Sequence, residues 1–313
     1  MLAAARAFNL NSIKTRLVLF FLLFGVIPAL CLMGVYFAFK GSIETAFRAP
    51  VKDTAAAIGD VIDRNLFERY GDVQAFGLNA AAWAPENWRN PAAGNMLVAA
   101  KNGYMTNYGI YRLMLFVDQQ GNVLAVNNID PKGKPLDTSA VYSMTFADAS
   151  WFKKAMAGEF LEGKEGFTGT VVEQPATSSV VAGLYNDDGF TIAFAAPVKN
   201  AAGERIGVWV NFADFGLVEE IVATFYKSLA ARGLEQAEIT ILDPEGRVLV
   251  DYDPVVNGAD YKRNPEIIGK LNLVEKGVAA AVAAVKGGSG VMLATHARKK
   301  VEQAAGFTHM VGA

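Results

Sequence analysis

Side chains that could carry covalent or metal chemistry are scarce in this sequence. The 313 residues include two histidines, His296 and His309, and one cysteine, Cys31. A lone cysteine cannot form an internal disulfide or a multi-thiolate metal site, and two histidines offer little for metal ligation or Ser-His catalysis. The sequence contains no nucleophile elbow, phosphate-binding loop or recognisable paired-carboxylate motif. The inventory therefore predicts no enzyme, no cofactor and no metal site, although a site built from carboxylates alone stays open.

Charge and hydrophobic content point toward a membrane and away from nucleic acid. The formal net charge is -2, whereas a nucleic-acid-binding face needs a basic stripe. Hydrophobic residues make up 52% of the chain, and many of them lie in residues 17–39, LVLFFLLFGVIPALCLMGVYFAF, which contain no charge. As a helix this segment is about 34 Å long, enough to cross the core of a bilayer.

We predict a single transmembrane helix over residues 17–39. A cleaved signal peptide is the alternative, but Tyr36, Phe37 and Phe39 make the far end too bulky for a typical cleavage site. Lysine and arginine counts tie on the two sides, so the positive-inside rule gives weak support. A short basic tail inside and a large folded domain outside is the simplest arrangement. Residues 1–16 are thus expected on the cytoplasmic side of the membrane, and residues 40–313 on the extracytoplasmic side.

A stalk helix is expected directly after the membrane segment, over residues 40–78. Its apolar residues recur in steps of three and four, which is the stripe of an amphipathic helix. They are Val51, Ala55, Ile58, Ile62, Leu66, Tyr70, Val73 and Phe76. Pro50 suits the start of a helix, whereas residues 41–47 could continue the membrane helix into this one, which would give one long rod. The stripe must pack on its own domain, on a twin helix or on both, and we expect a homodimer through this stalk.

One short unit occurs twice beyond the stalk. LFVDQQGNVLAVNNID runs over residues 115–130 and ITILDPEGRVLVDYDP over residues 239–254. Both contain Asp, two residues, Gly, one residue and Val-Leu, which is typical of a β-hairpin that turns at the glycine. Gly121 and Gly246 should therefore occupy equivalent turns. The predicted fold class is α+β, with two tandem antiparallel-sheet lobes over residues 79–217 and 218–313.

Helices are expected between the strands of both lobes. SWFKKAMAG, residues 150–158, predicts a short helix closed by Gly158, and residues 217–231 predict a linker helix. Residues 264–287 predict a longer helix. The remaining strand candidates are FTGTVVEQ, FTIAFAAPVK, RIGVWVNFADF, GVMLATHAR and KVEQAAGFTHMVG.

The order and spacing of these segments resemble bacterial transmembrane receptors with a double Cache sensor domain, most often methyl-accepting chemotaxis proteins. The resemblance covers essentially the whole chain, from TRLVLFFLLFGVIP and RNLFERYGDVQAFGLN through SWFKKAMAG and GFTIAFAAPVKNAAGERIGVWVNFADF to HARKKVEQAAGFTHMVGA. It implies two PAS-like lobes, a small-molecule ligand in the membrane-distal lobe and a signal across the membrane. In such receptors further strands close the second lobe, and a second membrane helix, a HAMP linker and a coiled-coil region follow. We therefore expect an N-terminal fragment with an incomplete second lobe; a natural short protein is the alternative.

The resemblance also implies where a ligand binds. The amino-acid-binding branch uses an Arg-x-Trp-Tyr stretch and a later Asp for the amino group, and here the stretch reads Ala149-Ser150-Trp151-Phe152. Because the carboxylate-clamping Arg is missing, an amine or a small neutral compound is expected instead of an ordinary amino acid, unless Arg112 replaces the clamp. The predicted ligand-binding residues are Trp151, Phe152, Tyr185, Asp187, Asp188, Tyr111, Arg112 and Asn127.

Four functions are compatible with the sequence. The preferred one is the ligand-sensing region of a transmembrane chemoreceptor. The alternative is the same input domain on a sensor histidine kinase or a cyclic-dinucleotide enzyme. A membrane-anchored enzyme is disfavoured by the side-chain inventory, and an anchored scaffold without a ligand would show a distal lobe filled by its own side chains.

Overall fold

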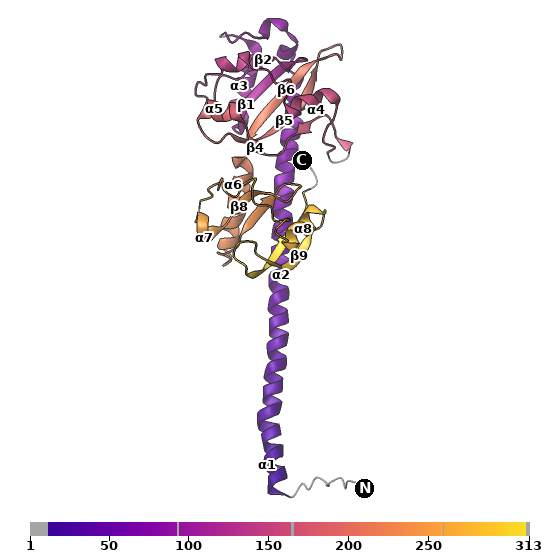
Figure 1. Ribbon diagram of the computed structural model, residues 1–313, viewed down its shortest axis with the longest axis vertical. Helices are drawn as coiled ribbons and strands as arrows, with labels where there is room; N and C mark the ends of the chain where they lie inside the picture. The colour runs from indigo at the N-terminus through magenta and orange to yellow at the C-terminus, as the bar shows by residue number, and fades with distance from the viewer. Residues whose placement is uncertain (1–11, 93, 164–165, 259, 311–313) are drawn as a thin grey trace.

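One continuous helix forms the axis of the molecule. The computed structural model describes residues 12–92, 94–163, 166–258 and 260–310, so most of the predicted tail, residues 1–16, lies outside the described residues. The rod begins with α1 (Ile13–Phe21), passes through a π-helical segment (Leu22–Val26) and continues as α2 (Ile27–Gly77). Figure 1 shows two lobes stacked beside the upper part of the rod, far from its lower end.

The lower part of the rod is long and apolar enough to cross a membrane. The candidate span is Ile13–Phe39, 27 residues long; its most apolar 18-residue window has a mean hydropathy of 2.7, and no residue of that window is buried by the rest of the chain. It contains the predicted segment 17–39. The π-helical segment directly precedes Pro28, whose ring and missing N–H disturb regular helical bonding.

Pro50 is not a helix start, and the expected continuous rod is confirmed. Pro50 lies inside α2, which runs unbroken from the apolar span into the lobes. A proline inside a helix removes one backbone hydrogen bond. The helix tolerates the loss of this hydrogen bond because regular helical bonding continues on both sides of Pro50, and no new helix begins there.

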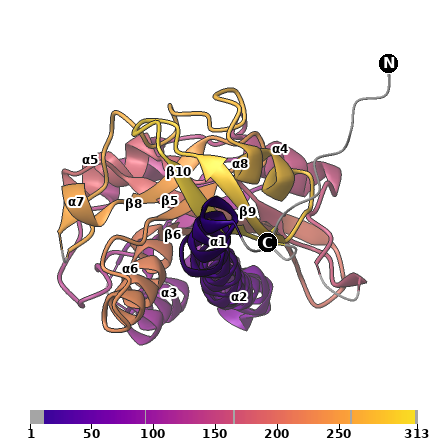
Figure 2. The same ribbon diagram turned by 90° about the horizontal axis from the view of Figure 1, so that it is seen from below.

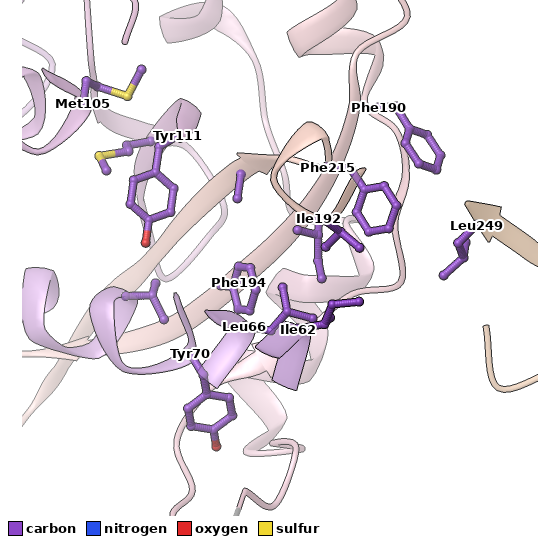
Figure 3. Packing of buried hydrophobic residues seen from close by; sticks show 14 of the residues in the cluster. Ile62, Leu66, Tyr70, Met105, Tyr111, Phe190, Ile192, Phe194, Phe215 and Leu249 are labelled. Carbon is purple, nitrogen blue, oxygen red and sulfur yellow. The ribbon is translucent and has the colours of Figure 1, made fainter. Parts of the chain in front are cut away.

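The apolar stripe of α2 is confirmed as the surface on which the lobes pack. Ile58, Ile62, Leu66, Tyr70, Val73 and Phe76 are all buried. Figure 3 shows Ile62 and Leu66 close to Phe194 and Ile192 of the first lobe's sheet. Each fully buried side chain of this size contributes roughly 1.5–3 kcal/mol to stability.

The first lobe contains one antiparallel sheet between two helical layers. The strand order is β2-β1-β6-β5-β3, and β4 also pairs with β5. The helices α2 and α3 cover one face of the sheet, whereas α4 and α5 cover the other. The bounds are α3 (Met96–Tyr108), β1 (Tyr111–Asp118), β2 (Val123–Val126), α4 (Ser150–Ala157), β3 (Val171–Val172), β4 (Ala176–Thr177), α5 (Ser179–Tyr185), β5 (Phe190–Lys199) and β6 (Arg205–Asp214), with short 3-10 turns at Ala80–Trp83, Pro85–Asn87 and Ser139–Ser143.

The short helix at residues 150–157 and its end at Gly158 are confirmed, because Gly158 has a φ of +77°. The helix α5 was not predicted. It is only seven residues long, and Ser178 caps it by accepting a hydrogen bond from the Val181 N–H. Such a short, locally capped helix has too little apolar periodicity to be visible in the sequence.

The second lobe begins with α6 (Gly216–Ala230), which confirms the predicted linker helix. It continues with β7 (Ile239–Leu242), β8 (Val248–Tyr252), α7 (Pro254–Asn257), α8 (Ala279–Val285), β9 (Gly290–Thr295) and β10 (Glu302–Phe307). The pairs β7–β8 and β9–β10 form two separate two-stranded sheets. Seen along the rod in Figure 2, α6 and α3 lie on the same side of α2, so the helix that precedes each repeated hairpin takes the same place.

The predicted long helix over residues 264–287 is wrong. Only its last third is helical, as α8, and the residues before it form turns. Gly269 and Gly277 both have a φ of +72°, which is incompatible with a right-handed helix. These two glycines therefore form turns inside the expected helix, and helical structure begins only after Gly277.

The two repeated hairpins have the same local geometry, as the sequence predicted. Asp118 Oδ1 accepts hydrogen bonds from the backbone N–H groups of residues 120 and 122, and Asp243 Oδ1 accepts them from residues 245 and 247. The register of each ladder shifts at the same place relative to its aspartate. The shift falls between Phe116 and Val117 in the first hairpin and between Ile241 and Leu242 in the second. Gly121 and Gly246 have φ values of +82° and +88°. The turns are equivalent.

Replacing Gly121 with alanine should destabilise the chain more than replacing Gly203. Both glycines have a φ of +82°, where a side chain costs roughly 1–2 kcal/mol. An added Cβ at Gly121 would also lie 2.4 Å from the Ala147 nitrogen, whereas nothing lies within 4 Å at Gly203. Urea unfolding of the two variants in detergent should show a further loss of about 1–3 kcal/mol for Gly121→Ala. Equal losses would contradict the close packing at this turn.

Candidate functional site

The structure brings three of the eight predicted site residues into one charged cluster. Arg112 lies at the start of β1, Tyr185 ends α5, and Asp187 follows in the turn before β5. The Arg112 guanidinium contacts the Asp187 carboxylate at 2.5 Å and lies 4.1 Å from the centre of the Tyr185 ring. The Tyr185 hydroxyl donates a hydrogen bond of 2.7 Å to the Arg112 carbonyl oxygen. The short helix α5 thus places ring and carboxylate against one buried arginine.

A third acid completes the cluster at the end of β6. Asp214 Oδ2 lies 3.9 Å from Arg112 Nε. The Arg112 side chain is only 8% exposed, whereas the side chains of Asp187 and Asp214 are 46% and 47% exposed. The cation therefore lies inside and two half-exposed acids lie outside. Sequence reasoning missed Asp214, because nothing in RIGVWVNFAD shows that its last residue returns beside the first residues of β1.

The exposed part of this cluster is negatively charged, because the carboxylates of Asp187 and Asp214 reach the surface whereas Arg112 is buried. Burial raises the pKa of Tyr185, and the nearby carboxylates of Asp130, Asp187 and Asp214 raise it further against the opposing effect of Arg112. Burial also raises the pKa of Asp187, but hydrogen bonds from Arg112 and the Gly189 N–H outweigh it, so the pKa lies below its usual value. Tyr185 therefore stays neutral while Asp187 stays ionised. A partly exposed carboxylate beside an aromatic ring is a site that suits an ammonium group.

The neighbouring Asp188 points to the second lobe. Its carboxylate pairs with the guanidinium of Arg263, which also binds both oxygens of Glu219 in α6 at 2.8 and 3.0 Å. Arg263 additionally lies 4.6 Å from the centre of the Phe190 ring. Burial raises the pKa of Glu219 despite this arginine. Two consecutive aspartates thus bind arginines of different lobes.

Trp151 and Phe152 lie in the hydrophobic layer under α4. Each is 6% exposed, and the Trp151 ring packs against Phe146, Phe152 and Phe212 at centroid distances of 5.7 to 6.4 Å. They share the α4–α5 face of the sheet with Tyr185. The structure therefore places both side chains in the hydrophobic layer against which Tyr185 packs.

Tyr111 is not brought together with the other site residues. Its side chain packs on the α2 face of the sheet, where its hydroxyl donates to Asp72 at 2.5 Å. Figure 3 shows Tyr111 beside Met105 of α3.

Asn127 is fully buried, and its amide oxygen accepts from the Met114 N–H while its nitrogen donates to the Ile129 carbonyl. These bonds fix the chain at the end of β2.

A buried lysine on the α3 side was not predicted from the sequence. Lys101 is fully buried in α3, its nitrogen lies 3.2 Å from the centre of the Trp209 ring, and the described residues offer it no hydrogen-bond partner. Burial lowers the pKa of Lys101 well below its usual value, because the charged amine loses its hydration there. The pattern MLVAAKNGYM gives no signal for this burial, since lysine ordinarily lies at the surface.

The described part of the charged cluster holds neither a candidate metal site nor the large cavity of the molecule. Within the described ranges, no group of three or more His, Cys, Asp and Glu side chains is arranged to hold a metal ion. A cavity of about 920 Å³ is lined by α2, by β7 and β10 of the second lobe, and by first-lobe residues that include Ile192 and Phe215. None of the eight predicted ligand-binding residues lines it.

The fold of this chain is similar to the folds of bacterial sensory domains. No protein-family model and no curated protein matches the chain, whereas 51 chains of solved structures do. The ligand-binding domain of the Campylobacter jejuni chemoreceptor Tlp3, in complex with L-valine, is 11% identical with a TM-score of 0.55, covering 85% of this chain and 89% of its own. That of the Pseudomonas aeruginosa PAO1 amino acid chemoreceptor PctC, in complex with GABA, is 13% identical with a TM-score of 0.52, covering 85% and 94%.

A similar likeness extends to a second receptor class. The extracellular domain of vpHK1S-Z8, named as a histidine kinase, is 14% identical with a TM-score of 0.52, covering 79% of this chain and 84% of its own. The chain spans 35% of the length of a further match, an extracellular ligand binding receptor from Desulfohalobium retbaense DSM5692, at a TM-score of 0.49. Identities this low establish the fold alone, and the fold is that of chemoreceptor sensory domains, as the sequence resemblance predicted.

Asp187→Asn should lower stability near neutral pH and lose this effect in acid. Because the folded-state pKa of Asp187 is depressed, its carboxylate stabilises the fold above the unfolded-state pKa of about 3.9, and this contribution disappears as the pH falls through the folded-state value. A double-mutant cycle with Arg112→Met should give a favourable coupling at pH 7 that is lost as the pH falls through the depressed folded-state pKa of Asp187. A coupling that is independent of pH would contradict the ion pair.

Lys101→Met should remove a pH dependence of stability on the alkaline side. The folded-state pKa of Lys101 is lowered, so between that value and about 10.4 the unfolded chain binds one more proton than the folded chain. Wild-type stability should therefore rise with pH, relative to the variant, by up to about 1.4 kcal/mol per pH unit. Unfolding curves from pH 7 to 10 test this, with Lys154→Met as a control because Lys154 is 43% exposed. Parallel curves for wild type and Lys101→Met would show that the amine is solvated.

Proposed function

We propose that this chain is the extracytoplasmic ligand-sensing region of a bacterial transmembrane chemoreceptor, with no catalytic activity of its own. Residues 17–39 cross the inner membrane, residues 1–16 are cytoplasmic and residues 40–313 lie in the periplasm. The first lobe, residues 79–217, is then the membrane-distal one and residues 218–313 form the linker helix and the proximal lobe. Support comes from the exposed apolar span on the rod and from the fold shared with chemoreceptor sensory domains.

The Arg112–Tyr185–Asp187 cluster is the observation that carries the ligand site. Asp187 and Asp214 offer half-exposed carboxylates beside the Tyr185 ring, while Arg112 lies beneath them. A small ligand with an ammonium group fits this arrangement, because both the acids and the ring face attract a cation. The ligands named for Tlp3 and PctC, L-valine and GABA, both carry an ammonium. Trp151 and Phe152 support the site from the hydrophobic layer behind it.

Competition for Asp187 supplies a route for the signal. A ligand ammonium that binds Asp187 weakens its hold on Arg112, and Asp188 follows directly in the same turn. Asp188 binds Arg263 of the second lobe, which is tied to Glu219 of α6. Ligand binding therefore favours one position of the second lobe over another, a shift between two populated states. Both lobes pack on α2, which leads into the membrane.

A homodimer through the stalk belongs to the same proposal, with one constraint from the structure. The stripe from Ile58 to Phe76 is already buried by the chain's own lobes. A twin helix must therefore meet other faces of the rod. The alternative output, a sensor histidine kinase, is supported by the fold likeness to vpHK1S-Z8. Reading the coding sequence beyond Ala313 distinguishes the two outputs.

Thermal-shift screening of small amines and amino acids tests the ligand site. A ligand present at a hundred times its dissociation constant should stabilise the chain by about 2.7 kcal/mol. Asp187→Asn should abolish this shift, because it removes the ammonium partner. Asp188→Asn is the matched control: it should keep the shift, since its carboxylate faces Arg263. Retention of the full shift in Asp187→Asn would place the ligand elsewhere.

A further inference from the structure

The turn between β9 and β10, residues 296–301, binds the open end of the β7–β8 hairpin. Lys299 Nζ contacts the Glu238 carboxylate, directly before β7, and lies 2.9 Å from Asp253 Oδ2, directly after β8. Arg298 contacts both carboxylate oxygens of Asp251 in β8, at 2.7 and 3.0 Å. Among the described residues, β7 and β8 form one two-stranded sheet, and β9 and β10 form another. The side chains of this turn therefore connect two sheets that share no backbone ladder.

His296 begins the turn, and its hydrogen bonds fix one tautomer of the ring. The Lys299 backbone N–H donates to His296 Nδ1 at 2.9 Å, so Nδ1 carries no proton. The proton of the neutral imidazole is then on Nε2, which donates to Glu238 Oε2 at 3.0 Å. Both side chains are largely buried, with 13% of His296 and 16% of Glu238 exposed. The neutral ring thus accepts from its own turn and donates to the residue before β7.

The charged side chains around His296 come from both hairpins, and three are acidic and two are basic. They are Glu238, Asp251, Asp253, Arg298 and Lys299. Burial raises the pKa of Asp253, but hydrogen bonds from Lys299 and from a backbone N–H outweigh it, so this pKa lies below its usual value. Burial lowers the pKa of Lys299, but its bonds to Glu238 and Asp253 outweigh that effect and place the pKa above its usual value. Asp253 and Lys299 therefore stay charged around neutral pH, where histidine is the side chain that ordinarily changes its charge.

Proton uptake by His296 removes one hydrogen bond from the turn. A proton on Nδ1 faces the Lys299 N–H, so two donors meet where a donor and an acceptor met before. The imidazolium also shares the Glu238 carboxylate with the Lys299 ammonium, and these like charges repel each other. Lys300 has a φ of +56°, which is uncommon for a residue other than glycine, so the turn depends on its internal hydrogen bonds. The bond from Nε2 to Glu238 persists in both charge states, and the backbone of the turn is the part that is released.

The strand that leaves this turn is packed tightly on the rod. A Cβ added to Gly306 of β10 would overlap the Val51 carbonyl oxygen, so the strand touches the backbone of α2. A Cβ added to Gly59 of α2 would lie 2.8 Å from the Thr308 side chain, just beyond β10. Because there is no free space between strand and helix, a movement of the turn changes the contacts of β10 with α2. The same helix continues into the apolar span.

We propose that His296 is a pH-sensitive latch of the second lobe. In its neutral form it holds residues 296–301 closed against β7 and β8, and proton uptake at Nδ1 opens the backbone of this turn. The chain then responds to acidification of its surroundings through the contact of β10 with α2. This input lies in the second lobe and is independent of the proposed ligand site in the first.

Amide-exchange NMR of the full chain in detergent tests the latch. The protection factor of the Lys299 amide, corrected for its intrinsic exchange rate, is measured from pH 8 to pH 5, the range in which histidine titrates. It should fall by about tenfold as His296 becomes protonated, which is the effect of one lost hydrogen bond. The imidazole C–H signals of His296 report its charge in the same samples, and both changes should share one midpoint.

Two variants separate His296 from other titrating groups. In His296→Asn the amide oxygen can still accept from the Lys299 N–H but does not titrate, so the protection should stay high at both ends of the pH range. His309→Asn is the matched control, because His309 is the only other histidine in the sequence. Its Nδ1 lies 3.1 Å from the Ala284 carbonyl oxygen, outside the turn, so this variant should keep the pH transition.

Three results contradict the latch. A Lys299 amide that keeps its protection while His296 titrates shows that the ring does not hold the turn closed. A transition that persists in His296→Asn, or disappears in His309→Asn, belongs to another group. Unchanged exchange in β1 and β5 verifies that each variant folds. If His296→Asn does not fold, the wild-type measurement decides alone: a shared midpoint of His296 and the Lys299 amide supports the latch, and separate midpoints overturn it.

Discussion

The whole structure depends on one helix surface that both lobes share. The helix α2 is unbroken from Ile27 to Gly77, so its apolar stripe keeps a single helical period along the entire stack. Tyr70, Val73 and Phe76 complete the core of the first lobe, whereas Ile58 and Ile62 line the cavity beside β7 and β10. Because both lobes bury the same stripe, α3 and α6 lie on the same side of the rod in Figure 2. A change in the packing of either lobe therefore alters the contacts of the helix that continues into the apolar span.

Charge provides the second connection between the lobes. Arg112 and Arg263 are both largely buried, and each depends on an aspartate of the same two-residue turn, Asp187 or Asp188. Removing one partner of a buried ion pair leaves an uncompensated charge, which is costly, so the two pairs cannot be disturbed freely. A ligand cation that reaches Asp187 acts on this pair directly and on its neighbour through one peptide bond. We propose that the first lobe senses and the second lobe responds for this reason.

Local patterns in the sequence were sufficient for the periodic elements. The stripe of α2, the two Asp-x-x-Gly hairpins, α4 and α6 were all predicted, because each depends on nearby residues with a regular period or a turn glycine. The failures have equally physical causes. The helix expected over residues 264–287 is interrupted by two glycines with positive φ, and Pro50 is carried inside a helix that continues on both sides. Of the charged cluster, Asp187, Tyr185 and Arg112 were among the residues predicted from the sequence, whereas the contacts of Asp214, Arg263 and Lys101 are tertiary and no local pattern encodes them.

We propose that a ligand ammonium competes with Arg112 for Asp187 and that the change reaches Arg263 through Asp188. Side-chain NMR of the arginine Nε–H groups, recorded while an ammonium ligand from the screen is titrated in, measures this most directly. We predict that the signals of Arg112 and Arg263 both shift and saturate at the same ligand concentration in the wild-type chain. With Asp188→Asn, Arg112 should still shift while Arg263 no longer follows. Saturable binding that leaves the Arg112 signal unchanged would contradict the account.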